Sequence, residues 1–143
     1  MAVIPVEPRP LDDSERAVLE HLLAADFAGA PALRAQLDRT EVTAVWGAGS
    51  VSVDLRVRGL ERDPAPAFVP LPVDAPVHDD SGEYVGELLV WAEGGVTLSA
   101  LEYAWVTDEM PTVLPTVDRI RVRAVGGAVG GAMGSGGADG RAG

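Results

Sequence analysis

The stretch that decides the fold is GELLVWAEGGVTLSALEYAW, residues 86–105. Two runs of aliphatic and aromatic residues flank the pair Gly94-Gly95, a pattern typical of two antiparallel strands joined by a glycine turn. Acidic residues stand among the apolar ones in both runs. The segment therefore predicts either the middle of a hydrophobic core or a surface that meets a partner.

The register of this hairpin decides which side chains share a face, because a slip of one residue moves every side chain to the opposite face. A two-residue turn at Gly94 and Gly95 places Glu87 directly opposite Glu102. Like charges in that position are destabilising unless a metal ion or a shared proton compensates. This register therefore predicts a carboxylate pair.

A three-residue loop over residues 93–95 puts the two glutamates on opposite faces, and we favour this register because it needs no special site. In either register Glu102 shares a face with apolar residues, which makes it a candidate partly buried carboxylate. The three-residue loop also gathers an aromatic face, which consists of Leu89, Trp91, Leu101, Tyr103 and Trp105.

Large amphipathic aromatic side chains are enriched in interface hot spots, but in strands they also commonly pack beneath helices. The sequence leaves both alternatives open. Two acidic residues border the aromatic face in the segment that follows. The predicted binding residues are therefore Trp91, Glu102, Tyr103, Trp105, Asp108 and Glu109.

Helical spacing precedes the hairpin along the chain. Asp12 followed by Glu15 is a capping-box pattern, and apolar residues at helical spacing come directly after it. A second, shorter helix is predicted around Pro31, which suits a first helical turn, with Leu33 and Leu37 four residues apart. We expect these two helices to form a hairpin ahead of the strands.

From residue 41 the apolar period changes from 3.6 to 2, which predicts a strand over residues 51–57 and its hairpin partner over residues 41–46. Five prolines in residues 59–76 suit an extended loop or a sheet edge. A last strand is expected over residues 120–125. Helices followed by strands predict an α+β fold, in which a helical hairpin packs on one face of an antiparallel sheet of about four to six strands.

The chain has 143 residues, enough for one domain with a hydrophobic core. We expect an extended segment over residues 1–10, a single α+β domain over residues 11–125, and a disordered Gly/Ala-rich tail over residues 126–143. No apolar run approaches the roughly 18 residues of a membrane span. Prolines at positions 5, 8 and 10 break any leader pattern, so we expect a cytoplasmic protein with no membrane partner.

Composition narrows the function classes. The absence of cysteine excludes disulfides, thiolate catalysis and cysteine-ligated zinc. The net charge of -11 repels phosphate backbones, and residues 1–118 carry seven arginines against 21 acidic residues, so nucleic-acid binding is disfavoured. Such an acidic surface favours a basic protein partner or serves solubility alone.

The sequence carries no P-loop, G-x-S-x-G or H-E-x-x-H motif. The cluster HDDSGE, residues 78–83, offers oxygen ligands, but its spacing does not match an EF-hand loop, and a solvated turn is the preferred interpretation. We therefore expect no catalytic residue, no metal site and no cofactor.

Three segments carry a resemblance to other proteins: ERAVLEHLLAADFAGAPALRAQL, SVDLRV and DDSGEYVGELLVWAEGGVTLSALEYAW. Together they resemble a group of small uncharacterised proteins of high-GC bacteria, with a helical pair, a strand of the SVDL type, and D-x-x-G before a hairpin ending L-S-x-L-E. The resemblance covers roughly residues 11–118 and implies no catalytic residues. Such proteins are similar in size and acidity to immunity proteins that neutralise toxins.

Three functional hypotheses follow. The first is a non-enzymatic, acidic protein-binding domain of immunity type, which occludes a basic toxin or enzyme by charge and aromatic contact. The second is a small enzyme or metal-binding domain that uses Glu87 and Glu102 as a carboxylate pair and requires the two-residue turn. The third is a regulatory domain with a small ligand between helices and sheet.

Overall fold

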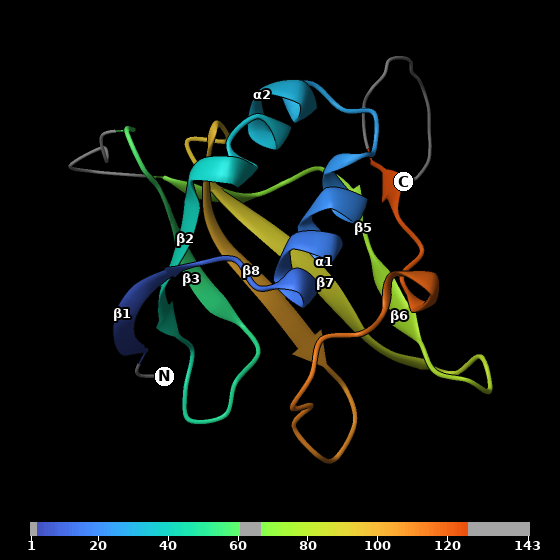
Figure 1. Cartoon of the computed structure of the whole chain (residues 1–143). Coiled ribbons are helices and arrows are strands. Elements are labelled where there is room, and N and C mark those ends of the chain that lie inside the picture. The colour runs from blue at the N-terminus through green and yellow to red at the C-terminus, as the bar shows by residue number, and fades with distance from the viewer. Residues whose placement is uncertain (1–2, 61–66, 126–143) are drawn as a thin grey trace.

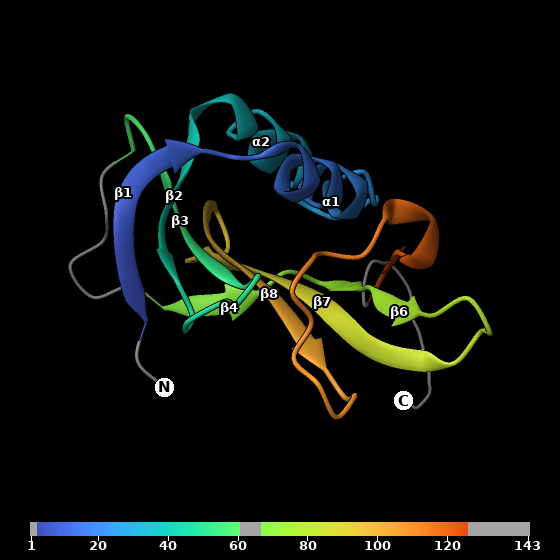
Figure 2. The same cartoon turned by 60° about the horizontal axis from the view of Figure 1, so that its bottom comes forward.

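The computed structural model describes residues 3–60 and 67–125 and has an α+β architecture (Figure 1). Two helices, α1 (Asp13–Leu23) and α2 (Ala30–Arg34), lie over one face of a curved sheet, while the opposite face carries no helix among the described residues (Figure 2). The predicted tail over residues 126–143 lies outside the described residues.

The sheet has seven strands in the order β1-β2-β3-β8-β7-β4, with β6 also pairing β7, and each pairing recorded for the described residues is antiparallel. Its strands are β1 (Ile4–Pro10), β2 (Thr40–Val45), β3 (Val53–Val57), β4 (Phe68–Pro70), β6 (Pro76–His78), β7 (Tyr84–Glu93) and β8 (Thr97–Trp105). A second, two-stranded sheet pairs β5 (Val73–Asp74) with β9 (Arg123–Ala124), and two short 3-10 helices are η1 (Leu37–Arg39) and η2 (Val117–Arg119). The sheet is therefore larger than the four to six strands expected.

The additional strands come from proline-rich segments. β1 pairs with β2 at one edge, so a strand precedes the helical hairpin, which the sequence placed first. β4 pairs with the end of β7 and β6 with its beginning. Proline lacks an amide donor and is tolerated on edge strands, which is why these segments join the sheet only at its borders.

Helix α1 begins with the predicted capping box. The Asp12 carboxylate accepts a hydrogen bond from the Glu15 N–H at 2.8 Å, and the Asp12 N–H donates to the Glu15 carboxylate at 2.9 Å. Pro31 lies in the first turn of α2, as predicted. Both helices bury their apolar faces against the sheet, and the buried helical residues are Val18, Leu19, Leu22, Leu23 and Leu33.

The hydrophobic core lies between the helices and the sheet. Its centre on the sheet is a row of three directly paired residues, Val53 on β3, Leu101 on β8 and Val90 on β7. These side chains and the helical leucines are almost fully buried, so they fill the middle of the helix–sheet interface. The alternate side chains of the same strands point to the opposite face, which we call the open face.

The β7–β8 hairpin follows neither of the two predicted registers. Glu93 pairs with Thr97 across a three-residue loop over residues 94–96, and Ser99 is an extra residue between the pairs formed by Leu98 and Ala100. Such a bulge shifts the register within a strand without a strong local signal. The predicted loop over residues 93–95 is therefore wrong by one residue, and the faces of the two strands change.

This register corrects two predictions about the faces. Glu87 pairs with Ala104 and Glu102 with Leu89, so the glutamates share the open face without being directly opposite each other. Tyr103 lies on the helix-covered face, whereas Trp91 lies on the open face, so the predicted aromatic face does not form. The carboxylate pair that the second hypothesis requires is not formed either.

Candidate binding site on the open face

A row of directly paired residues crosses the open face. Asp54 on β3 pairs with Ala100 on β8, Ala100 pairs with Trp91 on β7, and Trp91 pairs with Pro70 on β4. Directly paired side chains in neighbouring strands project to the same side of a sheet. The row therefore places a carboxylate and an indole on either side of a single methyl group.

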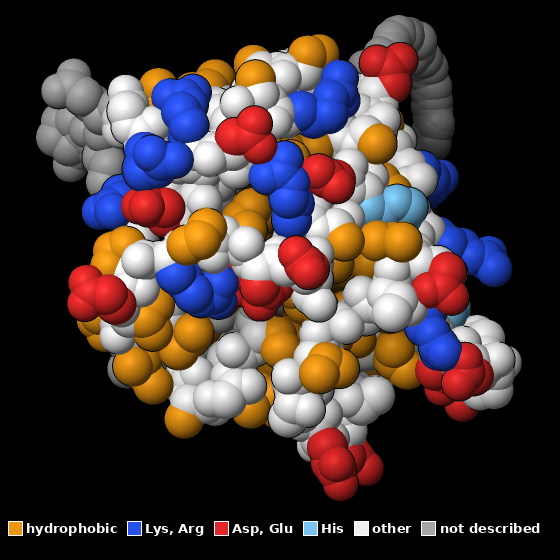
Figure 3. Space-filling model, viewed as in Figure 1, with side chains coloured by type: hydrophobic (Ala, Val, Ile, Leu, Met, Phe, Trp, Pro, Cys, Tyr) orange, Lys and Arg blue, Asp and Glu red, His pale blue; other side chains and the backbone are white. Residues whose placement is uncertain are grey.

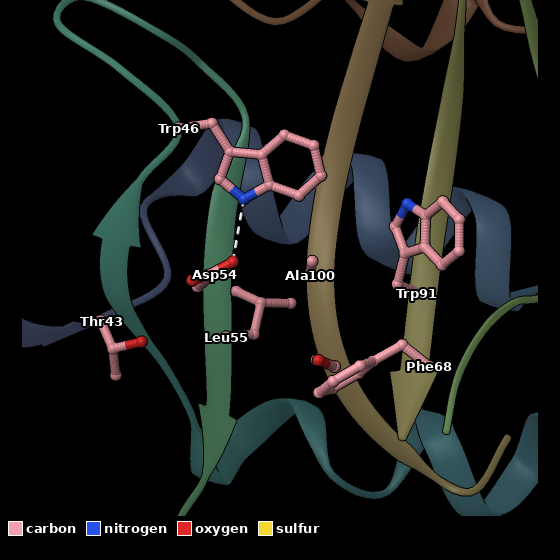
Figure 4. A pocket seen from close by; sticks show the side chains of 8 residues that line it. Thr43, Trp46, Asp54, Leu55, Phe68, Trp91 and Ala100 are labelled. Carbon is pink, nitrogen blue, oxygen red and sulfur yellow. Dashed lines mark hydrogen bonds between the residues drawn. The ribbon is translucent and has the colours of Figure 1, made fainter. Parts of the chain in front are cut away.

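The small side chain of Ala100 leaves a recess of about 340 Å³ between its larger neighbours. Trp46, which directly follows β2, and Phe68 of β4 also line the recess, and we call it the tryptophan recess. Figure 4 shows the two indoles on opposite sides of Ala100, with the helices behind the strands. The recess therefore opens away from the hydrophobic core.

Each indole of the open face is held by a carboxylate. Trp46 Nε1–H donates to Asp54 Oδ1 at 2.9 Å, and Trp91 Nε1–H donates to Glu102 Oε1 at 3.0 Å. Both tryptophans are half-buried. Because the hydrogen bonds hold the polar edges of the rings, the broad faces stay turned toward the open side of the sheet, as Figure 4 shows.

A second recess of about 260 Å³ adjoins the first. Trp46 and Trp105 line it together with Glu102 and Met110. Trp46 thus belongs to both recesses. The register places Trp105 on the same side of β8 as Tyr103, so Trp46 is the residue that links the second recess to the tryptophan recess.

The structure brings together some of the predicted binding residues and separates others. Trp91 donates a hydrogen bond to Glu102 on the open face. Trp105, at the end of β8, is 38% exposed. The exposed segment after β8 contains the other two acidic residues, Asp108 and Glu109. Tyr103 is 6% exposed and packs with the core, and its burial raises the pKa of the phenol.

Sequence reasoning missed Trp46, Asp54 and Phe68. The alternation of residues 51–57 places Asp54 on the solvent-facing side of its strand, so the sequence indicates the face on which Asp54 lies but not its neighbours there. Trp46 joins Asp54 because β2 and β3 form a hairpin that continues to the backbone bond from Trp46 N–H to the Ser52 carbonyl, 3.0 Å long. Phe68 lies in a proline-rich run whose pairing with β7 has no local signature.

Charge is distributed differently on the two sides of the molecule. Arginine and acidic side chains alternate over the helix-bearing side (Figure 3), where Arg16 pairs with Glu20 at 2.9 Å and with Asp38 at 2.8 Å. On the open face the carboxylates of Asp54 and Glu102 hydrogen-bond to indoles, and neither has a salt bridge among the described residues.

The one arginine on β3, Arg56, also lies on the open face. It donates to the Glu41 carboxylate at 2.8 Å and is not part of the recess lining. Its charge is therefore balanced by Glu41. Among the described residues, no arginine forms a salt bridge with the carboxylates of Asp54 and Glu102 beside the tryptophan recess.

The cluster over residues 78–83 is a turn held by one carboxylate. Asp79 Oδ1 accepts from the Ser81 N–H at 3.0 Å, the Ser81 hydroxyl at 2.9 Å and the Glu83 N–H at 2.9 Å. These hydrogen bonds, that of Glu83 first, hold the pKa of Asp79 below its ordinary value. Residues 3–60 and 67–125 contain no group of three or more His, Asp or Glu side chains placed to hold a metal ion.

The chemical groups of the open face suit recognition. Two indoles, the Phe68 ring, the Asp54 carboxylate and the hydroxyls of Thr43 and Ser99 line the tryptophan recess, and the Glu102 carboxylate accepts the hydrogen bond of Trp91. Within the part of the chain that the structure describes, no helix has the length and apolar character to cross a membrane. Comparisons of this chain with protein-family models, with curated proteins and with solved structures find no match.

Proposed function

We propose that the protein is a non-enzymatic, acidic protein-binding domain that docks a basic protein on its open face, in the manner of an immunity protein that neutralises a basic toxin. The observation that carries the proposal is the pair of half-buried tryptophans on that face, each held by a carboxylate without an arginine partner among the described residues. Aromatic side chains surrounded by negative charge suit a partner with a positively charged surface.

The net charge of the chain supports this proposal. At -11, it creates a negative potential that attracts basic proteins and speeds their encounter. The exposed Asp108 and Glu109 lie in the segment after β8, directly before Met110, which lines the second recess, so they add negative charge near that recess. Electrostatic steering acts mainly on the association rate, and salt screens it.

Exposed apolar side chains support the same face. Phe68 is 45% exposed on β4, and Met110 is exposed beside Trp105. Phe68 lines the tryptophan recess, and Met110 lines the second recess. An apolar centre bordered by charged groups is the usual composition of a protein interface.

The first test is capture of a partner followed by reconstitution. The tagged protein is incubated with native lysate, a recovered basic protein is purified, and its binding is measured by stopped-flow at salt concentrations from about 50 to 500 mM. We expect the association rate to fall about tenfold or more over that range. Co-expression should also suppress any toxicity of the partner.

Two double variants that remove the same charge from opposite faces provide the matched control. Asp54→Asn with Glu102→Gln removes two carboxylates from the open face, and Glu20→Gln with Asp38→Asn removes two from the helix-bearing side. We expect the first to weaken the complex about tenfold or more and the second about twofold or less. Equal effects of the two variants, or binding that is independent of salt, would contradict the proposal.

A second candidate function is a small-ligand-binding regulatory domain. The volume of the tryptophan recess, about 340 Å³, is within the range of ligand pockets. A thermal-shift screen of small metabolites tests it. A compound that raises the melting temperature, and no longer does so when Trp91 is replaced by alanine, would favour this function over protein binding.

A further inference from the structure

We infer that the tryptophan recess is an arginine-binding site, which receives one arginine side chain of the partner. This inference rests on the proposed function, since it names the group through which a basic protein would engage the open face. The recess offers aromatic ring faces, nearby negative charge and a small floor residue in one place.

The two indoles provide the attraction for a cation. The face of an aromatic ring carries negative electrostatic potential, and tryptophan binds cations more strongly than tyrosine or phenylalanine. In both Trp46 and Trp91 the N–H donates to a carboxylate, at 2.9 and 3.0 Å, and this charge-assisted bond polarises the ring toward greater negative potential. A cation over either ring therefore meets π-electron density and a nearby carboxylate together.

The groups around the rings favour guanidinium over ammonium. A guanidinium is planar, weakly hydrated and stacks on aromatic faces, whereas an ammonium is a compact and strongly hydrated charge. Asp54 and Thr43, both labelled in Figure 4, offer oxygen acceptors for the several N–H groups of a guanidinium, and the hydroxyl of Ser99 also lines the recess. The lining thus suits arginine better than lysine.

Ala100 provides the space. It stands directly between Asp54 and Trp91 in the paired row, and its methyl group forms the floor between the two indoles (Figure 4). The resulting volume of about 340 Å³ is at the lower end of ligand pockets and suits a single long side chain. A larger residue at position 100 would occupy the recess from below while leaving both indoles in place.

The inference is tested with N-acetyl-arginine methylamide and its citrulline analogue, which has nearly the same shape and no charge. Binding is followed through the three indole N–H signals in nitrogen–proton correlation spectra, assigned with single Trp→Phe variants. We expect the arginine compound to shift the signals of Trp46 and Trp91 more than that of Trp105. The citrulline analogue should bind about fivefold more weakly or worse, and the lysine analogue should also bind more weakly.

The variant Ala100→Leu should abolish these shifts while the protein stays folded, as judged by its thermal melting and the remaining spectrum. If that variant does not fold, Asp54→Asn is the second test and should weaken arginine binding without closing the recess. Equal binding of the citrulline analogue, shifts confined to Trp105, or undiminished arginine binding by Ala100→Leu would each overturn the inference.

The two proposals fail separately. A basic partner that binds the open face of the Ala100→Leu variant with full affinity would overturn the arginine site and leave the proposed function standing. Uptake of the arginine compound by the recess without any basic protein partner would leave the site standing and remove the proposed function.

Discussion

The ring of Tyr103 lies over Gly86, its diagonal neighbour on the adjacent strand. A Cβ atom on Gly86 would come within 2.8 Å of Tyr103 Cε1 and 2.6 Å of the Ala104 carbonyl oxygen. The strands can approach and the ring can cover the backbone only because residue 86 has no side chain. Tyr103 therefore packs the hairpin, and its predicted role in binding stays a prediction.

Replacing Gly86 with alanine should lower the free energy of unfolding by about 2 kcal/mol, because the nearest clashing atom belongs to the backbone and cannot rotate away. Urea denaturation measures the change. Tyr103→Phe, which keeps the ring, is the control and should cost less than about 1 kcal/mol. A Gly86→Ala protein as stable as the parent would show that the contact relaxes freely.

Gln36 should be a second sensitive position, because its buried side chain joins the segment after α2 to the β7–β8 hairpin. Its Nε2 donates to the Val96 carbonyl at 2.7 Å, and its Oε1 accepts from the Leu98 N–H at 3.0 Å. Gln36→Met would leave both backbone groups unpaired, so we expect a loss of about 3 kcal/mol in chemical denaturation. Asp38→Asn, at an exposed position nearby, should change stability by about 0.5 kcal/mol or less.

Local patterns predicted the local elements. The capping box at Asp12 and Glu15, the short helix at Pro31 and the alternating strand that contains Asp54 are all present. Each of these elements depends on residues only a few positions apart, so local sequence patterns predict them. The placement of the helices on one face of an antiparallel sheet follows from the same patterns.

The pairing of strands that are distant in the sequence could not be predicted from local patterns. The bulge at Ser99 changes which side chains of β7 and β8 share a face. No local sequence pattern around Ser99 predicts this bulge. Trp46 and Trp91 meet in one recess only because β3 and β8 pair, which brings Asp54 beside Ala100. Propensity and period describe single strands, whereas the site is a property of four neighbouring strands.

Glu15 should contribute strongly to stability, because its buried carboxylate has three donors. Arg9 Nη1 and Nη2 each donate to it at 2.9 Å, as does the Asp12 N–H, and its side chain is 5% exposed. The hydrogen bonds with Glu15 also raise the pKa of Arg9. We expect Glu15→Ala to lower the free energy of unfolding by about 2 kcal/mol, since it removes the Glu15 half of the capping box and leaves the Arg9 guanidinium without its carboxylate partner.

The matched control for Glu15 is Glu20→Ala on the same helix, where the carboxylate pairs with Arg16 and is 54% exposed. Exposed pairs four residues apart on a helix contribute about 0.5 kcal/mol or less. Urea denaturation of both variants compares the two sites. Similar losses would mean that the capping-box bond and the Arg9 ion pair of Glu15 together contribute no more than one exposed ion pair.

The turn over residues 79–83 should open at acidic pH. Its hydrogen bonds to Asp79 lower the pKa of that carboxyl below the ordinary value near 3.8. A carboxyl with a lowered folded pKa contributes stability above its unfolded pKa, and this contribution disappears as the pH falls through the folded value. The amide signals of Ser81 and Glu83 should therefore titrate together with a midpoint below 3.8.

Two variants separate Asp79 from its neighbour in that titration. Asp79→Asn keeps a carbonyl oxygen that accepts the same N–H groups but cannot titrate, so the amide signals of the turn should become independent of pH in the acidic range. Asp80→Asn removes the ion pair with Arg119 and should leave the midpoint of the Ser81 and Glu83 signals below the ordinary value. A midpoint at or above that value in the parent protein would show that the turn does not stabilise the ionised carboxylate.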